Sequence, residues 1–171
     1  MKQLRHISRI RGFTLVELLV VIGILGILAA GLLAAIDPLE QLKKGRDQSK
    51  RGIAIELNNA VIRYYAVFGT MPWGNAALAA EALSTFTAPV NLLTGAGELK
   101  PTFMGALPGN FGGALTVMGG ISGGGFAVCF DPESKSISRD PSSIFSSLAA
   151  YPPTEGINPG TTDSGWFWCA R

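Results

Sequence analysis

The chain is poor in charged residues and almost without histidine. Only 15% of its 171 residues are charged, whereas globular domains average about 25%. Its one histidine, His6, lies near the N-terminus, ahead of a long apolar run. Catalytic sites of the Ser/His/Asp or Cys/His type need an imidazole beside the nucleophile. That chemistry is therefore excluded, and we expect no enzymatic activity.

Metal and phosphate motifs are missing as well. The two cysteines, Cys129 and Cys169, form no Cys-x-x-Cys pair, and no Gly-Lys-Ser/Thr follows the glycines of residues 112–125. Calcium stays open as an alternative, because three acids lie near a predicted turn. Acids at a turn are more often solvated, so we expect neither a metal nor a cofactor. The three acids are Asp131, Glu133 and Asp140.

Residues 13–36 form an apolar run with a single charged residue, Glu17. A helix of that length spans roughly 36 Å, enough to cross a hydrocarbon core of about 30 Å. The residues before it include four basic side chains and no acid, which predicts that they stay cytoplasmic while the rest of the chain lies outside. A carboxylate at bilayer depth costs about 3 kcal/mol and points to a functional partner. The basic residues are Lys2, Arg5, Arg9 and Arg11.

The stretch Arg11-Gly12-Phe13-Thr14-Leu15-Val16-Glu17 resembles the N-terminus of a type IV prepilin, the precursor of a pilus or pseudopilus subunit. The family pattern is a basic leader ending in glycine, then Phe-Thr-Leu-x-Glu-Leu and an unbroken apolar helix. The resemblance implies that prepilin peptidase cleaves after Gly12, which makes residues 1–12 a leader, and that the new amine of Phe13 is N-methylated. It also implies that Glu17 pairs with the Phe13 amine of a neighbouring subunit during assembly.

Two other interpretations of the apolar run are a secretory signal peptide and a plain single-span anchor. A signal peptide has an apolar core of only about 7–15 residues, and this run is longer and contains a glutamate. A plain anchor fits the length but leaves Glu17 unexplained. The motif therefore favours the prepilin interpretation.

A second, amphipathic helical segment is predicted over residues 37–70. Asp37 suits the N-cap position, Pro38 the first helical position, and Glu40 completes a capping box. We therefore predict a helix kink at Asp37 and Pro38. Gly69 and Pro72 are expected to end the helix. Its apolar stripe comprises Leu39, Leu42, Ser49, Ile53, Leu57, Ala60, Tyr64 and Phe68.

The amphipathic half also carries a basic cluster. Anionic lipid or DNA is one possible ligand, but Glu40 and Asp47 interleave with the cluster and aromatic residues do not, so we expect a solvated or subunit-facing stripe. Removal of the leader leaves ten basic against twelve acidic residues, and nucleic acid is therefore not an expected partner. The cluster comprises Lys43, Lys44, Arg46, Lys50 and Arg51.

The remaining residues, 71–171, are predicted to form a globular head with a small antiparallel sheet. Strands are expected near residues 114–118 and at 126–130, and a turn at 131–134 is expected to lead into a weaker returning strand at 135–139. Helical turns are expected within residues 75–86, 90–93, 98–103 and 141–151. The C-terminal aromatics, Trp166, Phe167 and Trp168, predict a final strand or loop packed on the sheet beside Cys129.

The cysteines of an exported head are more often bridged than free, with two buried thiols as the alternative. A bridge closes a loop of about 40 residues and stabilises the fold by roughly 4 kcal/mol. Such a bridge resembles the disulfide-bounded C-terminal region of pilins. The expected fold is therefore α+β and type IV pilin-like: a long kinked N-terminal helix, half of it transmembrane, packed on a small antiparallel sheet with a disulfide-bounded C-terminal region.

The resemblance implies a structural subunit of a type IV pilus that serves adhesion, motility or DNA uptake. The implied partners are prepilin peptidase, other pilin subunits, the inner-membrane assembly platform and, before assembly, the lipid bilayer. The implied location is the bacterial inner membrane, with one span and the head outside the cytoplasm, and then a cell-surface pilus. A type II secretion pseudopilin, a DNA-binding minor pilin and a single-span protein with a ligand-binding head are the alternatives. Beyond Gly69 the head has only four basic residues, which argues against DNA.

Overall fold

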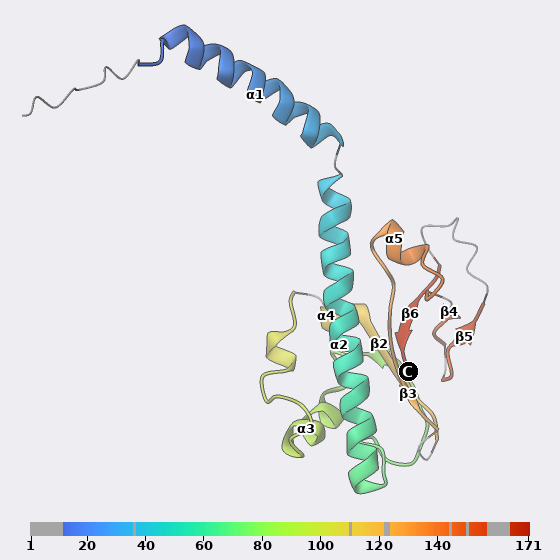
Figure 1. The fold of residues 1–171 in the computed structure, drawn as a ribbon. Helices are drawn as coiled ribbons and strands as arrows, with labels where there is room; N and C mark the ends of the chain where they lie inside the picture. The colour runs from blue at the N-terminus through green and yellow to red at the C-terminus, as the bar shows by residue number, and fades with distance from the viewer. Residues whose placement is uncertain are drawn as a thin grey trace, which may run out of the picture. The chain divides into compact units, whose positions relative to one another are not determined.

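The computed structural model describes residues 12–35, 37–109, 111–121, 124–143, 145–149, 151–156 and 165–171. The chain divides into two compact units, Met1–Pro38 and Leu39–Arg171. The first contains helix α1 (Leu15–Ala35), and the second contains the head together with nearly all of helix α2 (Pro38–Phe68) (Figure 1). Residues 1–11 of the expected leader and Ile36 at the expected kink lie outside the described residues.

The main sheet of the head has four antiparallel strands in the order β1-β2-β3-β6. A second sheet pairs two short strands, β4 and β5, and Phe145 at the start of β4 bridges to Phe167 just before β6. In the part of the head that the structure describes, four short helices lie between strands. The strands are β1 (Leu78–Ala82), β2 (Leu115–Gly119), β3 (Phe126–Phe130), β4 (Phe145–Ser147), β5 (Thr154–Glu155) and β6 (Trp168–Ala170). The short helices are α3 (Thr87–Gly95), η1 (Met104–Ala106), α4 (Phe111–Ala114) and α5 (Lys135–Ser138).

Alternation along the strands gives the sheet two apolar faces. Side chains of successive strand residues point to opposite faces, so Phe126, Val128 and Phe130 of β3 face one way and Ala127 and Cys129 the other. The first set belongs to the main core, where it joins the buried residues of α2. The second set packs in a smaller cluster on the opposite face. All five residues of β3 are buried. The α2 residues in the main core are Ala54, Leu57, Ala60 and Val61.

Helix α2 ends where the sequence predicts. Gly69 adopts φ +69°, and its N–H donates to the Tyr65 carbonyl oxygen at 2.8 Å. A glycine in the left-handed region just past the last helical residue is the commonest helix stop. The buried face of α2 differs in part from the predicted apolar stripe. Leu39 and Leu42 are exposed, and the first buried residues of the helix are Asp47 and Lys50.

Three short predictions in the head were wrong. The alanine-rich residues 75–86 contain strand β1 rather than a helix, because the open side of β2 offers a pairing partner and tertiary pairing outweighs helix propensity. Residues 135–139 contain helix α5 rather than a returning strand, since β6 occupies that side of β3. Within residues 141–151 the structure has strand β4, anchored by the buried Phe145, in place of a helical turn.

Candidate functional site

The first candidate site is the N-terminal start of α1, where Thr14 and Glu17 cap the helix reciprocally. The Glu17 backbone N–H donates to Thr14 Oγ1 at 3.2 Å, while Glu17 Oε2 accepts from the Thr14 backbone N–H and from Thr14 Oγ1, both at 3.0 Å. This is a capping box, which satisfies backbone donors that a helix start leaves open. Thr14 is a functional residue that the sequence analysis does not single out, although Thr-x-x-Glu ahead of an apolar run is the capping-box signature.

The expected processing residues lie immediately before this helix. Gly12 and Phe13 belong to no helix or strand, and the Phe13 side chain is exposed. Leu15–Leu33 of α1 is long and apolar enough to cross a membrane, and none of it is buried within the chain. The N-terminal helix therefore fits a membrane-anchored protein. A Cβ placed on Gly23 or Gly26 meets no atom within 4 Å in the described chain.

The expected kink residues lie between the two long helices. Helix α1 ends at Ala35 and α2 begins at Pro38, the first helical position that the sequence assigns to this proline. Asp37 belongs to neither helix. Glu40 has a partner in the head, because its Oε1 accepts from the Lys135 N–H at 2.7 Å, at the start of α5. The kink itself stays a prediction.

The second candidate site is a buried polar network between α2 and the turn before α5. Asp47 is 0% exposed. Its Oδ2 accepts from the Ser134 backbone N–H at 2.8 Å and from Ser134 Oγ at 2.7 Å, and its Oδ1 accepts from the Glu133 N–H at 3.0 Å. Three donors on one carboxylate offset the cost of burying its charge.

Lys50 lies one helical turn further along α2 and completes the network. It is 3% exposed, and its Nζ donates to Glu133 Oε1 at 2.5 Å and lies 3.8 Å from Asp47 Oδ1. The rings of Phe111 and Phe130 also face the ammonium group, with centroids 5.7 and 5.9 Å from Nζ. The buried ammonium group is therefore paired with two carboxylates and two aromatic rings.

Three of the five basic-cluster residues have partners in the head, but only Lys50 is buried, so the expectation of a solvated or subunit-facing stripe was wrong for Lys50. Besides Lys50, Arg46 Nη2 lies 2.7 Å from Glu133 Oε2, and the Arg51 guanidinium lies 4.8 Å from the centre of the Trp168 ring. The signal that we missed is spacing: Asp47 and Lys50 lie on the same helical face as the buried Leu57.

The three acids that the sequence offered as calcium ligands, Asp131, Glu133 and Asp140, each lie in a different environment. The hydrogen bond from Lys50, aided by the charge of Arg46, lowers the pKa of Glu133, and each of its carboxylate oxygens contacts a cation. Burial raises the pKa of Asp131, while hydrogen bonds from the Ser142 side chain and backbone lower the pKa of Asp140. Among the described residues, no group of three or more His, Cys, Asp or Glu side chains could hold a metal ion.

The two cysteines are bridged. Cys129 on β3 lies opposite Cys169 on β6, and their sulfurs form a disulfide that closes a separation of 40 residues. On the other face of β6, Trp168 is buried and contacts the Phe130 ring, with centroids 5.5 Å apart. The final strand pinned to Cys129 is therefore confirmed, as is the packing of one C-terminal aromatic, Trp168, on the sheet.

Comparison with known proteins adds one finding. The model of the prokaryotic N-terminal methylation motif matches residues 7–33. No curated protein and no solved structure matches the chain significantly. The match covers the proposed cleavage point, the Thr14–Glu17 capping box and most of α1. The chain therefore carries the signature of type IV prepilins at its N-terminus, followed by an α+β head with a Cys129–Cys169 disulfide.

Proposed function

We propose that the protein is a structural subunit of a type IV pilus, made as a prepilin that is cleaved after Gly12 and N-methylated at Phe13. The observation that carries the proposal is the methylation motif at residues 7–33, placed directly before an exposed apolar helix. Gly12 and Phe13 lie outside regular structure, which suits a bond that a peptidase must bind in extended form. The motif indicates a family of structural subunits, and we propose no catalytic role.

The capping box supports the assembly role of Glu17. Both hydrogen bonds that Glu17 accepts from Thr14 end on Oε2, and none to Oε1 occurs among the described residues. One oxygen therefore holds the carboxylate at the helix start while the other stays available. A protonated amine is the partner that such an oxygen prefers in an apolar medium. The N-methylated amine of Phe13 on a neighbouring subunit would supply it.

We further propose a route through the cell. The acid-free basic leader keeps the N-terminus in the cytoplasm, so α1 spans the inner membrane once and the head lies outside the cytoplasm. Prepilin peptidase and an inner-membrane assembly platform then process the subunit and assemble it with other pilins. In the assembled filament the chain would reach the cell surface. The oxidising compartment outside the cytoplasm accords with the disulfide.

The methylation motif fits a type II secretion pseudopilin equally well, and this is the second candidate. A DNA-binding minor pilin is less well supported, because residues 71–171 have only four basic residues, and Lys50 of α2 is buried. Three arginines are in addition paired with acidic side chains. The paired arginines are Arg46, Arg63 and Arg171.

Intact-mass analysis of shed filaments and of membranes tests the proposal. We expect a mature chain that begins at N-methyl-Phe13 and is abundant in filaments, whereas mature chain found only in membranes would favour a minor pilin or a pseudopilin. An uncut chain starting at Met1, or one cut after Ala35, would contradict the prepilin assignment.

Substitution of Glu17 tests the assembly step separately. Glu17→Gln keeps a carbonyl acceptor for Thr14 but removes the charge, so we expect normal cleavage and a filament yield lowered about tenfold or more. Glu81→Gln, the same change on the edge strand β1, is the matched control and should leave the yield unchanged. Equal yields for the two variants would refute the role of Glu17.

A further inference from the structure

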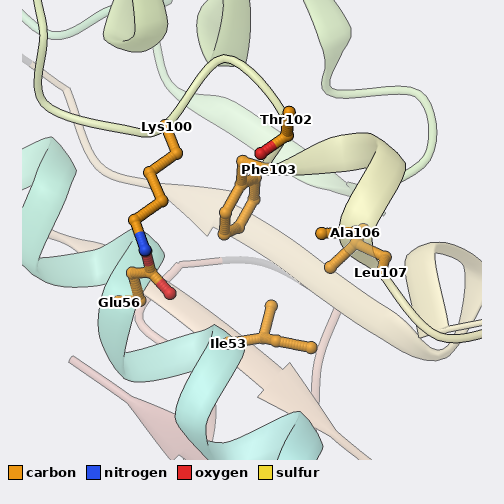
Figure 2. Close-up of a pocket in the computed structure, with 7 residues that line it drawn as sticks. All are labelled: Ile53, Glu56, Lys100, Thr102, Phe103, Ala106 and Leu107. Carbon is orange, nitrogen blue, oxygen red and sulfur yellow. The ribbon is translucent and has the colours of Figure 1, made fainter.

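A cavity of about 210 Å³ lies between α2 and the segment that leads into η1 (Figure 2). Its floor is apolar, formed by Ile53 of α2 together with Phe103, Ala106 and Leu107. Phe103 is 6% exposed, so the floor continues directly into the main core. This volume is below the roughly 300 Å³ at which sites for drug-sized ligands begin, and the cavity therefore fits only a small molecule.

The rim of the cavity carries three polar groups: the Glu56 carboxylate, the Lys100 ammonium and the Thr102 hydroxyl. None of these side chains has a hydrogen bond or an ion pair with another described residue. In Figure 2 the Lys100 side chain extends from its loop in the direction of α2, which carries Glu56, and both residues line the cavity.

The segment that carries Lys100 is held against α2 by polar contacts at Glu98 and by the buried side chain of Leu99. Arg63 Nε lies 2.7 Å from Glu98 Oε2, and Arg63 Nη2 donates to the Glu98 carbonyl oxygen at 2.8 Å. Leu99 is 4% exposed and belongs to the main core. Glu56 lies two helical turns before Arg63 and so on the same face of α2. The Lys100 backbone therefore follows two residues that are fixed against α2, the helix that carries Glu56, which reduces the ordering cost of binding.

We propose that this cavity binds a free α-amino acid with a branched apolar side chain, such as leucine. Glu56 binds its ammonium group, Lys100 binds its carboxylate, and Thr102 supplies a further hydrogen bond at the rim. The apolar side chain lies on the floor formed by Ile53 and Phe103. This binding function is additional to the proposed pilin function and does not depend on it.

The charges of the rim select this ligand class over others. Glu56 and Lys100 line one cavity of about 210 Å³, so a ligand that meets both must carry its ammonium and carboxylate groups near each other, as an α-amino acid does. A phosphate or a simple carboxylic acid would pair with Lys100 but meet repulsion from Glu56, and an amine would meet the reverse. A polar amino acid would leave the floor of Ile53 and Phe103 in contact with water.

Saturation-transfer NMR on the full-length protein in detergent micelles, with L-leucine as the probe, tests this site. We expect saturable binding of L-leucine. Four analogues should each bind at least about tenfold more weakly, because 4-methylpentanoate lacks the ammonium group, isopentylamine the carboxylate, L-serine the apolar side chain, and 6-aminohexanoate the placement of both charges on one carbon. The analogue series uses the unmodified protein, so its result does not depend on whether a variant folds.

Two variants identify the residues. Glu56→Gln and Lys100→Gln should each weaken leucine binding about tenfold, while Glu81→Gln and Lys44→Gln leave it unchanged. Absence of saturable leucine binding, equal binding of the analogues, or unchanged affinity in both rim variants would overturn the proposal. The experiment uses unassembled protein, so failure to form pili affects the pilin assignment alone.

Discussion

The Asp47 carboxylate accepts two hydrogen bonds from Ser134, one from its backbone N–H and one from its hydroxyl, across 87 positions of sequence. One buried side chain on α2 thus fixes the turn that leads from β3 into α5. Lys50 binds the neighbouring Glu133, so the same turn is held at two successive residues. The head is joined to its helix by charge as well as by apolar packing.

Asp47→Ala should destabilise the head by about 3 kcal/mol. The substitution leaves the buried Ser134 donors without acceptors and removes a carboxylate next to the buried Lys50. Urea unfolding of the full-length protein in micelles, followed by tryptophan fluorescence, measures the change. Asn59→Gln, on the exposed face of the same helix, should stay within about 0.5 kcal/mol of the parent. Similar values for both variants would show that the network contributes little.

Acid should weaken the head through Glu133. The folded state lowers the pKa of this carboxyl, so its ionised form stabilises the head at neutral pH, and the stabilisation is lost as the pH falls below about 4.3 and through the folded-state pKa. Asp131 has a raised pKa, and its protonation on acidification favours the folded state. Unfolding midpoints measured between neutral pH and about pH 3 should therefore fall less steeply in Glu133→Gln and more steeply in Asp131→Asn. Parallel curves for parent and variants would contradict both assignments.

Loss of the disulfide should cost the head roughly 4 kcal/mol, as the chain-entropy model gives for a loop of about 40 residues. The double variant Cys129→Ala, Cys169→Ala should unfold at lower urea than the oxidised parent and close to the reduced parent. Urea unfolding with and without a thiol reductant provides the measurement. If reduction leaves the midpoint of the parent unchanged, the bridge is not a source of stability.

Gly119→Ala should destabilise the head by about 1–3 kcal/mol. A Cβ at Gly119 would lie 2.3 Å from Trp73 Cζ2, and the Trp73 ring is itself held between those of Phe86 and Phe126. Gly113 in α4 is the matched control, since a Cβ there meets nothing within 4 Å, and Gly113→Ala should change stability by less than about 0.5 kcal/mol. Thermal unfolding compares the two, and equal melting temperatures would show that Trp73 moves aside.

Sequence patterns predicted the long elements well because their signals are long. The apolar run starting at Phe13 gave α1, Gly69 marked the end of α2, and the alternating apolar residues 126–130 gave β3 with its bounds. The predictions for the short elements were wrong, because β1 and α5 depend on partners far away in the sequence. An alanine-rich segment becomes β1 only because β2 lies beside it, and Lys135 starts a helix where Glu40 accepts its N–H.

The same limit applies to the candidate sites. The residues Gly12, Phe13 and Glu17 are recognisable because their motif is local, whereas the Asp47–Lys50 network joins residues more than 80 positions apart. Charged residues on a helix are usually solvated, and nothing within α2 itself identifies Glu133 as a partner. The cavity beside Lys100 could not be predicted from the sequence for the same reason, because its walls come from two separate segments.

The position of the Cys129–Cys169 bridge also determines where the head tolerates change. Because the two cysteines lie opposite each other on adjacent strands, the intervening residues leave the main sheet and return to it at one point. Doubling the length of a closed loop costs only about 0.6 kcal/mol of closure entropy. Peptide epitopes or affinity tags inserted into the loop that the bridge closes should therefore add little closure entropy to the cost of pairing β3 with β6.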